Sequence, residues 1–177
     1  MIRIFIFLLV SSCTHHQVLI PYSRKDWKHW TDSNRNCLNT RNEVLKSRSL
    51  IPVKLNKRGC AVLAGRWQDY YYPEFHSTPR KIDIDHIVPL KHAHSNGGAH
   101  WSKKQKEMFA NDPDNLVITN RSYNRKKGAK GIDAWLPVHQ EYACKYIKDW
   151  MKIKEKYQLS FSPSEGKTIK QAKCKFN

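Results

Sequence analysis

Residues 82–90 read Ile-Asp-Ile-Asp-His-Ile-Val-Pro-Leu and place two reactive side chains inside an apolar stretch. The β-branched and apolar residues around Asp85 and His86 predict a short buried strand. Pro89 cannot donate a ladder hydrogen bond, so the strand should end close to it. An acid and an imidazole at the end of a strand indicate either a structural turn pair or a chemical site.

Strand geometry adds a condition to the second interpretation. Ideal alternation sends neighbouring side chains to opposite faces of a strand. Asp85 and His86 can therefore share one site only if the strand ends, bulges or twists there. The nearby Pro89 favours an early end.

The segments around this strand predict a single α+β domain without internal repeats. Upstream, residues 37–50 predict a helix with a capping box formed by Thr40 and Glu43. Residues 60–72 are apolar and aromatic, which predicts a strand or hairpin.

Downstream, hydrophobic periodicity and capping residues predict four further elements. They are a helix from Ser102 to about Asn111, a strand over 115–119, a helical turn capped by Ser122, and a helix over 140–157. The last helix carries an apolar stripe, which we interpret as core packing.

The first 13 residues have the layout of an export signal. Arg3 precedes an apolar run that is too short to span a bilayer, and small residues follow. Cys13 also fits a bacterial lipoprotein signal, so a lipid on Cys13 is one alternative, and a short buried strand is another. We expect residues 14–177 to form the mature domain in the periplasm, on the outer membrane or in the medium.

The remaining cysteines agree with an oxidising compartment. Without Cys13, four are left, and chain order favours the pairs Cys37–Cys60 and Cys144–Cys174. Three connectivities remain open on sequence alone. Their spacing lacks the short pairs of a structural zinc site, although His92, His94 and His100 could form a second metal site.

The charge of the chain indicates an anionic partner. Lys and Arg number 32 against 15 Asp and Glu, which gives a formal net charge of +17. Nucleic acid and an anionic membrane surface are the usual partners of such a chain, and an inert basic surface is the alternative.

Three blocks in fixed order carry a family resemblance. They are DHIVPL at 85–90, FANDPDNLVITNRSYNRKKG at 109–128 and AWLP at 134–137. Together they resemble the HNH endonucleases (His-Me finger), and most closely the branch shared by the C-terminal nuclease domain of the GmrSD restriction enzymes and small secreted bacterial nucleases. The likeness covers roughly residues 22–165 and implies a ββα-metal core with additional helices.

The resemblance also implies roles for individual residues. His86 would be the general base that activates water, and Asp85 and Asn124 would hold one divalent metal, Mg²⁺ or Mn²⁺. Asn115 would brace the hairpin or orient His86. Imidazole has a suitable pKa for this proton transfer, and carboxylate and amide oxygens suit a hard cation. Taken singly, Asp85-His86, Asn115 and Asn124 could each be structural.

A basic cluster directly follows Asn124. We predict that it contacts substrate phosphates, which positions nucleic acid without reading its sequence. Its members are Arg125, Lys126, Lys127 and Lys130. A solvated basic turn is the alternative.

These observations predict an exported, metal-dependent endonuclease that cleaves DNA with little sequence preference, and the sequence leaves open whether RNA is a second substrate. Three other functions remain open. They are a catalytically idle DNA-binding module on the same scaffold, a nuclease toxin with an immunity partner, and a cationic protein that binds membranes.

Overall fold

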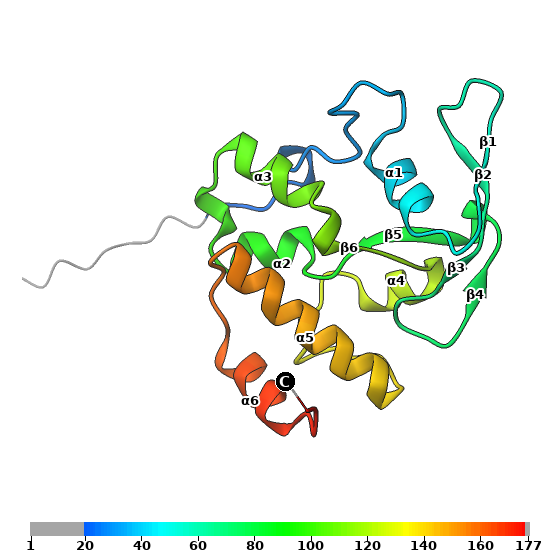
Figure 1. Ribbon diagram of the computed structural model, residues 1–177. Coiled ribbons are helices and arrows are strands. Elements are labelled where there is room, and N and C mark those ends of the chain that lie inside the picture. The colour runs from blue at the N-terminus through cyan, green and yellow to red at the C-terminus, as the bar shows by residue number, and fades with distance from the viewer. Residues whose placement is uncertain (1–19, 176–177) are drawn as a thin grey trace, which may run out of the picture.

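The computed structural model describes residues 20–175, which form an α+β domain (Figure 1). The predicted signal over 1–13, including Cys13, lies outside these residues. Within the described part of the chain, no helix is both long and apolar enough to cross a membrane.

The centre of the fold is an antiparallel hairpin followed by a helix. Strand β5 (Ile82–His86) pairs with β6 (Leu116–Asn120), and helix α4 (Arg121–Lys127) continues directly from β6. The Asn120 side chain caps α4 by accepting a hydrogen bond from the Ser122 backbone N–H, so Asn120, not Ser122 as predicted, is the cap. This strand–strand–helix order confirms the predicted ββα core.

The pairing of β5 with β6 is regular along its whole length, from Ile82 opposite Asn120 to His86 opposite Leu116. The strand neither bulges nor shifts at Asp85 and His86. It simply ends at His86, which is one of the three conditions that the sequence left open.

The connection between β5 and β6 is largely helical. It contains α2 (Leu90–Ser95), a 3₁₀ turn (Gly98–His100), α3 (Lys103–Ala110) and a second 3₁₀ turn (Pro113–Asn115). The predicted capping box of Ser102 and Gln105 is present at α3. Helix α2 was not predicted, because Pro89 followed by a short, histidine-rich segment gives no periodic signal.

Two small hairpins and α1 (Thr40–Ser47) precede β5. Strand β1 (Lys54–Leu55) pairs with β2 (Val62–Ala64), and β3 (Trp67–Gln68) pairs with β4 (Phe75–His76). The segment 60–72 therefore contributes to two hairpins and not to one. Between them lies Gly65, where a Cβ atom would approach the Trp67 ring to 2.6 Å. Short 3₁₀ turns cover Arg24–Asp26 and Pro79–Lys81.

The predicted cap of α1 is wrong by one residue. Asn39 precedes the helix, and its side-chain oxygen accepts a hydrogen bond from the Asn42 backbone N–H. Thr40, the predicted cap, is instead the first helical residue. Its hydroxyl donates to the Thr31 carbonyl oxygen.

Two helices end the chain. Helix α5 (Gln140–Lys156) crosses the domain, and α6 (Pro163–Gln171) lies beside it near the C-terminus (Figure 1). The predicted apolar stripe is core packing, since Tyr146, Trp150 and Ile153 are buried. Helix α6 was not predicted, although Ser162 and Glu165 form a capping box at its start.

The two faces of the β5–β6 hairpin point into different surroundings. Ile82 and Ile84 face a cluster built with α1 and β2, whereas Val117 belongs to a larger cluster that includes α2 and α5 residues. Two disulfides, Cys37–Cys60 and Cys144–Cys174, tie loops to this core. Of the three connectivities open on sequence, this is the one favoured by chain order.

Candidate active site

A cavity of about 340 Å³ opens where β5 ends. It brings together three of the predicted site residues, Asp85, His86 and Asn124. The rest of its lining comes from the start of the described chain, from the β5–α2 junction and from the end of α4. These residues are Tyr22, Arg24, Ile84, Pro89, Leu90, Lys91, Gly128 and Ala129.

The imidazole of His86 is held in one tautomer. Its Nε2 lies 2.9 Å from the Ala110 carbonyl oxygen, which can only accept, so Nε2 carries the proton and donates it. Nδ1 is then the nitrogen with a free lone pair. The Trp30 ring stacks on the imidazole at 6.1 Å between centroids and fixes its plane.

Burial makes His86 a neutral group over a wide pH range. Burial lowers its pKa to about 4, and the Lys127 and Arg24 charges act in the same direction, against the Ala110 hydrogen bond and the Asp85 carboxylate. At neutral pH the imidazole is therefore unprotonated and its Nδ1 lone pair is free, but with this pKa it is a weaker base than the ordinary imidazole expected from the sequence.

Asp85 is buried beneath the cavity and is anchored on one side. Its Oδ2 accepts a hydrogen bond from the Tyr71 hydroxyl at 2.8 Å and pairs with Lys127 Nζ at 2.9 Å. Its Oδ1 accepts from the His86 backbone N–H at 2.8 Å. An ionised carboxylate has about four lone-pair sites, so this arrangement leaves room for one more partner.

Asn124 reaches the cavity from the middle of α4. Its Nδ2 donates to Asp83 Oδ2 at 3.1 Å, and Asp83 also accepts from Arg121 Nε at 3.3 Å. The amide nitrogen is therefore occupied, which leaves the carbonyl oxygen of Asn124 as the group available to a ligand. Asp83 stands two residues before Asp85, on the same face of β5.

Asn115 is fully buried and braces the two strands. Its Oδ1 accepts from the Val88 backbone N–H at 2.8 Å, and its Nδ2 donates to the Val88 carbonyl at 3.2 Å. Both contacts tie the chain after β5 to the start of β6. Of the two roles predicted for Asn115, this geometry supports bracing.

The donor set at the cavity fits a hard divalent cation. A carboxylate and an amide carbonyl are oxygen ligands, and Mg²⁺ commonly takes only one or two protein ligands and completes its shell with water and substrate. Within residues 20–175, no three His, Cys, Asp or Glu side chains cluster closely enough to hold a metal ion. The expected ligands, Asp85 and Asn124, would not form such a cluster.

The loop histidines do not converge on a second metal site. His92 lies 3.3 Å from the Glu165 carboxylate, whereas the His94 ring donates to the Ile20 carbonyl at 2.8 Å. His100 is exposed on the 3₁₀ turn. Each histidine therefore has separate surroundings.

The predicted basic cluster divides into two parts. Arg125 and Lys126 in the last turn of α4, and Lys130 just after it, are exposed and can meet a polyanion. Lys127 is fully buried, pairs with Asp85 and donates to the His86 carbonyl at 2.7 Å, so the prediction that it contacts phosphate is wrong. Of the three consecutive cations that end α4, only Lys127 faces the core, because successive residues of a helix point about 100° apart.

Four residues at the site were not predicted from sequence. Arg24, Lys91 and Tyr22 line the cavity, and Tyr71 anchors Asp85 beneath it. Lys91 directly follows the DHIVPL block, which is the one signal that could have indicated it. The other three come from segments that only the tertiary fold brings to β5.

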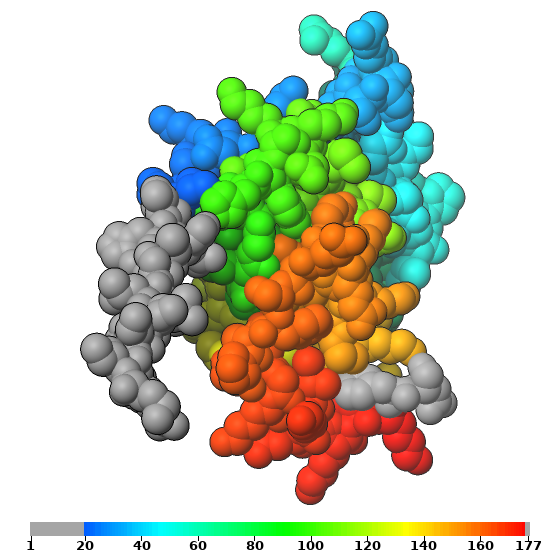
Figure 2. Space-filling model, turned by 90° about the vertical axis from the view of Figure 1, so that its left-hand side faces the viewer, coloured from blue at the N-terminus to red at the C-terminus, as the bar shows by residue number. Residues whose placement is uncertain are grey.

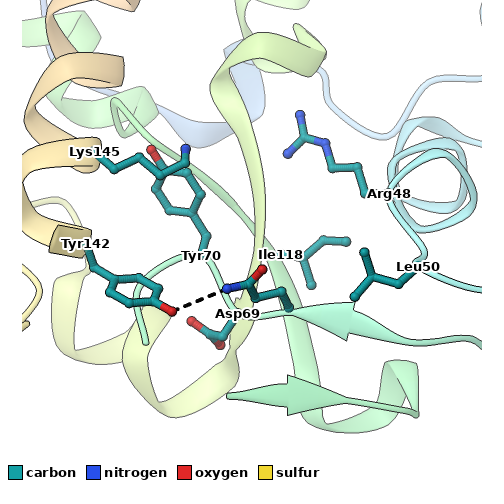
Figure 3. A pocket seen from close by; sticks show the side chains of 8 residues that line it. Arg48, Leu50, Asp69, Tyr70, Ile118, Tyr142 and Lys145 are labelled. Atoms are coloured by element: carbon teal, nitrogen blue, oxygen red, sulfur yellow. Dashed lines mark hydrogen bonds between the residues drawn. The ribbon is translucent and has the colours of Figure 1, made fainter. Parts of the chain in front are cut away.

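A second, smaller cavity of about 190 Å³ lies between β3 and α5 and contains none of the predicted site residues. Figure 3 shows Tyr142 of α5 and Arg48 on opposite sides of it, with Asp69 and Tyr70 between them. The Gln68 amide donates to the Tyr142 hydroxyl at 3.3 Å across its rim. These contacts connect α5 to the β3–β4 hairpin. The cavity at the end of β5 is the candidate site because it holds Asp85, His86 and Asn124.

The domain thus combines an α+β fold, a ββα core, and a cavity at the end of β5 that is lined by Asp85, His86 and Asn124. This combination indicates a nuclease of the ββα type. A family model for the C-terminal domain of GmrSD restriction endonucleases matches residues 40–170. The chain therefore belongs to this HNH-like nuclease-domain family.

A relative from the curated proteins extends this finding. A protein of Arthroderma benhamiae described as an "Uncharacterized secreted protein" is 36% identical over 150 residues, which cover 84% of this chain and 72% of the relative. No solved structure matches the chain.

Proposed function

We propose that the protein is an exported, metal-dependent endonuclease that hydrolyses phosphodiester bonds of DNA with little sequence preference, with RNA as an alternative substrate. The observation that carries this proposal is the meeting of Asp85, His86 and Asn124 at one cavity in a nuclease-domain family. The net charge of +17 supports a polyanionic substrate that is bound through its backbone.

Each residue has a task that its surroundings permit. His86 accepts a proton from the attacking water at Nδ1, because Nε2–H is already committed to Ala110. The proton shift onto the imidazole is the general-base step. Asn115 and Lys127 keep the strand end fixed, so that the imidazole stays aligned with the substrate phosphorus.

Asp85 and Asn124 would hold a divalent cation, Mg²⁺ or Mn²⁺. Such an ion would stabilise the charge that develops on the phosphoryl and leaving oxygens. Lys127 offsets part of the Asp85 charge, so a cation bound here keeps much of its positive charge for the substrate. By family analogy the products would carry 5′-phosphate and 3′-hydroxyl ends.

Two features support export. The chain has two disulfides, which persist in oxidising compartments, and the fungal relative is described as secreted. Cleavage of a signal near residue 13, with or without a lipid on Cys13, belongs to this proposal. An immunity partner would be expected only if the nuclease acts as a toxin.

The test is a plasmid-nicking assay with the oxidised protein, with Mg²⁺ or with EDTA. We expect nicking that requires Mg²⁺ and that falls roughly 10²–10⁴-fold in His86→Ala, the usual contribution of a general base. His100→Ala is the matched control, because His100 is an exposed histidine away from the cavity.

Tight plasmid binding without cleavage in Mg²⁺, Mn²⁺ or Zn²⁺ would contradict the proposal. It would favour a DNA-binding module that uses the same scaffold. Binding to anionic vesicles that does not depend on His86, without nicking, would favour a membrane-binding protein.

A further inference from the structure

The segment 20–30 precedes the family match, which begins at residue 40, and yet it forms one wall of the candidate active site. In Figure 2 the start of the described chain, in blue, lies on the surface beside the green residues of the β5–β6 connection. The segment therefore contributes two lining residues, Tyr22 and Arg24, that lie outside the ββα core.

Three contacts hold this segment in place. Trp27 is buried, with its ring against Trp101 and Phe109 at centroid distances of 5.8 and 5.6 Å. The His94 ring donates to the Ile20 carbonyl, and the Asn111 amide donates to the Lys28 carbonyl at 2.8 Å. The segment is therefore anchored at Ile20 and again at Trp27 and Lys28, and Arg24 lies between these two anchors.

Arg24 lies within this anchored stretch and lines the cavity with Asp85, His86 and Asn124. Its backbone carbonyl accepts from the Trp27 N–H at 3.1 Å, which joins its position to the buried tryptophan. Arg24 forms no ion pair with any carboxylate in residues 20–175. The Arg24 guanidinium lies beside the Tyr22 hydroxyl, at a cavity whose one carboxylate, Asp85, is already paired with Lys127.

We propose that Arg24 binds the scissile phosphate of the nucleic acid. This inference rests on the proposed nuclease function and adds a substrate-binding residue to it. A guanidinium can donate two parallel hydrogen bonds to phosphate oxygens, which fixes orientation as well as charge. Lys91, across the same cavity, adds a second cation without this geometry.

The experiment compares Arg24→Ala with Lys25→Ala. Both residues are exposed cations on the same 3₁₀ turn, and both substitutions lower the net charge by one, but only Arg24 lines the cavity. Cleavage of a short fluorescent DNA duplex in Mg²⁺ gives kcat/KM, and thermal melting confirms that each variant is folded.

For Arg24→Ala we expect kcat/KM to fall about 10²–10³-fold, as on removal of a donor to developing charge. Arg24→Lys should recover part of this loss, since it restores the charge but not the paired hydrogen bonds. Lys25→Ala should stay within about twofold of the unmodified protein, because exposed charges away from a site contribute little.

The salt dependence of binding is a second measurement, taken in EDTA so that no cleavage is required. Arg24→Ala should reduce the slope of log K against log salt by about 0.9, the contribution of one phosphate contact. Equal rates and equal slopes for Arg24→Ala and Lys25→Ala would overturn the inference. If the unmodified protein does not cleave DNA at all, the proposed function fails, and the salt slope still decides the phosphate contact.

Discussion

Two buried lysine–carboxylate pairs lie in this protein, one at the candidate site and one under the C-terminal helices. Lys127 pairs with Asp85 at 2.9 Å, and Lys154 pairs with Glu165 at 2.8 Å. Both lysines are fully buried, and burial lowers the pKa of each. The two pairs thus share their chemistry and differ in what surrounds the carboxylate.

The Glu165 carboxylate is saturated. Its Oε1 accepts from Lys154 and from the Trp150 indole N–H at 2.8 Å each, and its Oε2 accepts from Lys154 and from the Ser162 backbone N–H. Glu165 is completely sealed from solvent. No lone pair is left for a ligand, and the pair joins α6 to α5.

The Asp85 carboxylate has fewer hydrogen-bond partners than its two oxygens can accept. It lines a cavity, and one of its oxygens is engaged by only the His86 backbone N–H. A buried ion pair becomes a functional site when one side of the carboxylate stays open to ligands. Three predictions test this contrast.

The largest expected effect is on stability, at the fully buried Lys154–Glu165 pair. Glu165→Gln removes the counter-charge of Lys154 and should lower the free energy of unfolding by about 3–5 kcal/mol, because an unpaired charge would remain buried. Urea unfolding measures this change.

The matched control replaces both partners, as Glu165→Gln with Lys154→Met. This double variant should regain much of the loss, since no buried charge remains. A loss below about 1 kcal/mol in the single variant would show that the pair contributes little, as exposed pairs do.

The second largest effect is expected on the rate of cleavage, at the Lys127–Asp85 pair beside the cavity. Asp85→Asn keeps the shape of the side chain but removes the metal-binding charge, and should lower Mg²⁺-dependent cleavage about 10²–10³-fold, equal to about 2.7–4.1 kcal/mol. Activity per folded molecule is the measurement.

Glu165→Gln serves as the control for this rate, because it breaks the other buried pair. Its activity per folded molecule should be unchanged at a temperature where it is folded. Equal rate losses in the two variants would mean that disturbed packing, and not the open carboxylate, limits cleavage.

The smallest effect is on the pH dependence of stability. Burial opposes ionisation of Glu165, but hydrogen bonds from His92, Lys154 and Ser162 outweigh it and lower its pKa to about 2. In the unfolded chain the pKa of this carboxyl is near its ordinary value of 4.5, so the unfolded state binds more protons between these two pKa values. Stability is thus present above pH 4.5 and is lost as pH falls toward 2.

The size of this loss is at most about 3 kcal/mol, from 1.36 kcal/mol per pKa unit. Unfolding at pH 6, 4 and 2.5 measures it. In Glu165→Gln, the free energy of unfolding should change less between pH 6 and pH 2.5 than in the unmodified protein. An unchanged pH dependence in this variant would show that other carboxylates cause the loss of stability in acid.

Much of the core could be predicted from short-range patterns. The β-branched residues before Pro89 define β5, and the capping box of Ser102 and Gln105 defines α3. The predicted caps of α1 and α4 are wrong because an Asn shortly before each predicted cap, Asn39 or Asn120, is an equally good cap and starts the helix earlier. Helix α2 was missed because it is short and gives no periodic signal.

The site itself was only partly predictable. Ordered motifs indicated Asp85, His86 and Asn124, and the fold brings all three to one cavity. Lys127 looked like its exposed neighbours Arg125 and Lys126, because nothing local shows which side of α4 faces Asp85. Arg24 and Tyr71 carried no signal, since they meet the site through contacts distant in sequence.

The ββα order, the basic charge and the family resemblance follow from the amino-acid sequence, because strand patterns, charge and motifs are local properties of the chain. Which lysine is buried, which carboxylate keeps a free acceptor site and which arginine lines the cavity become clear only in the folded domain. These depend on how distant segments pack around β5, and the burial that results sets both the charge state of His86 and the partners of Asp85.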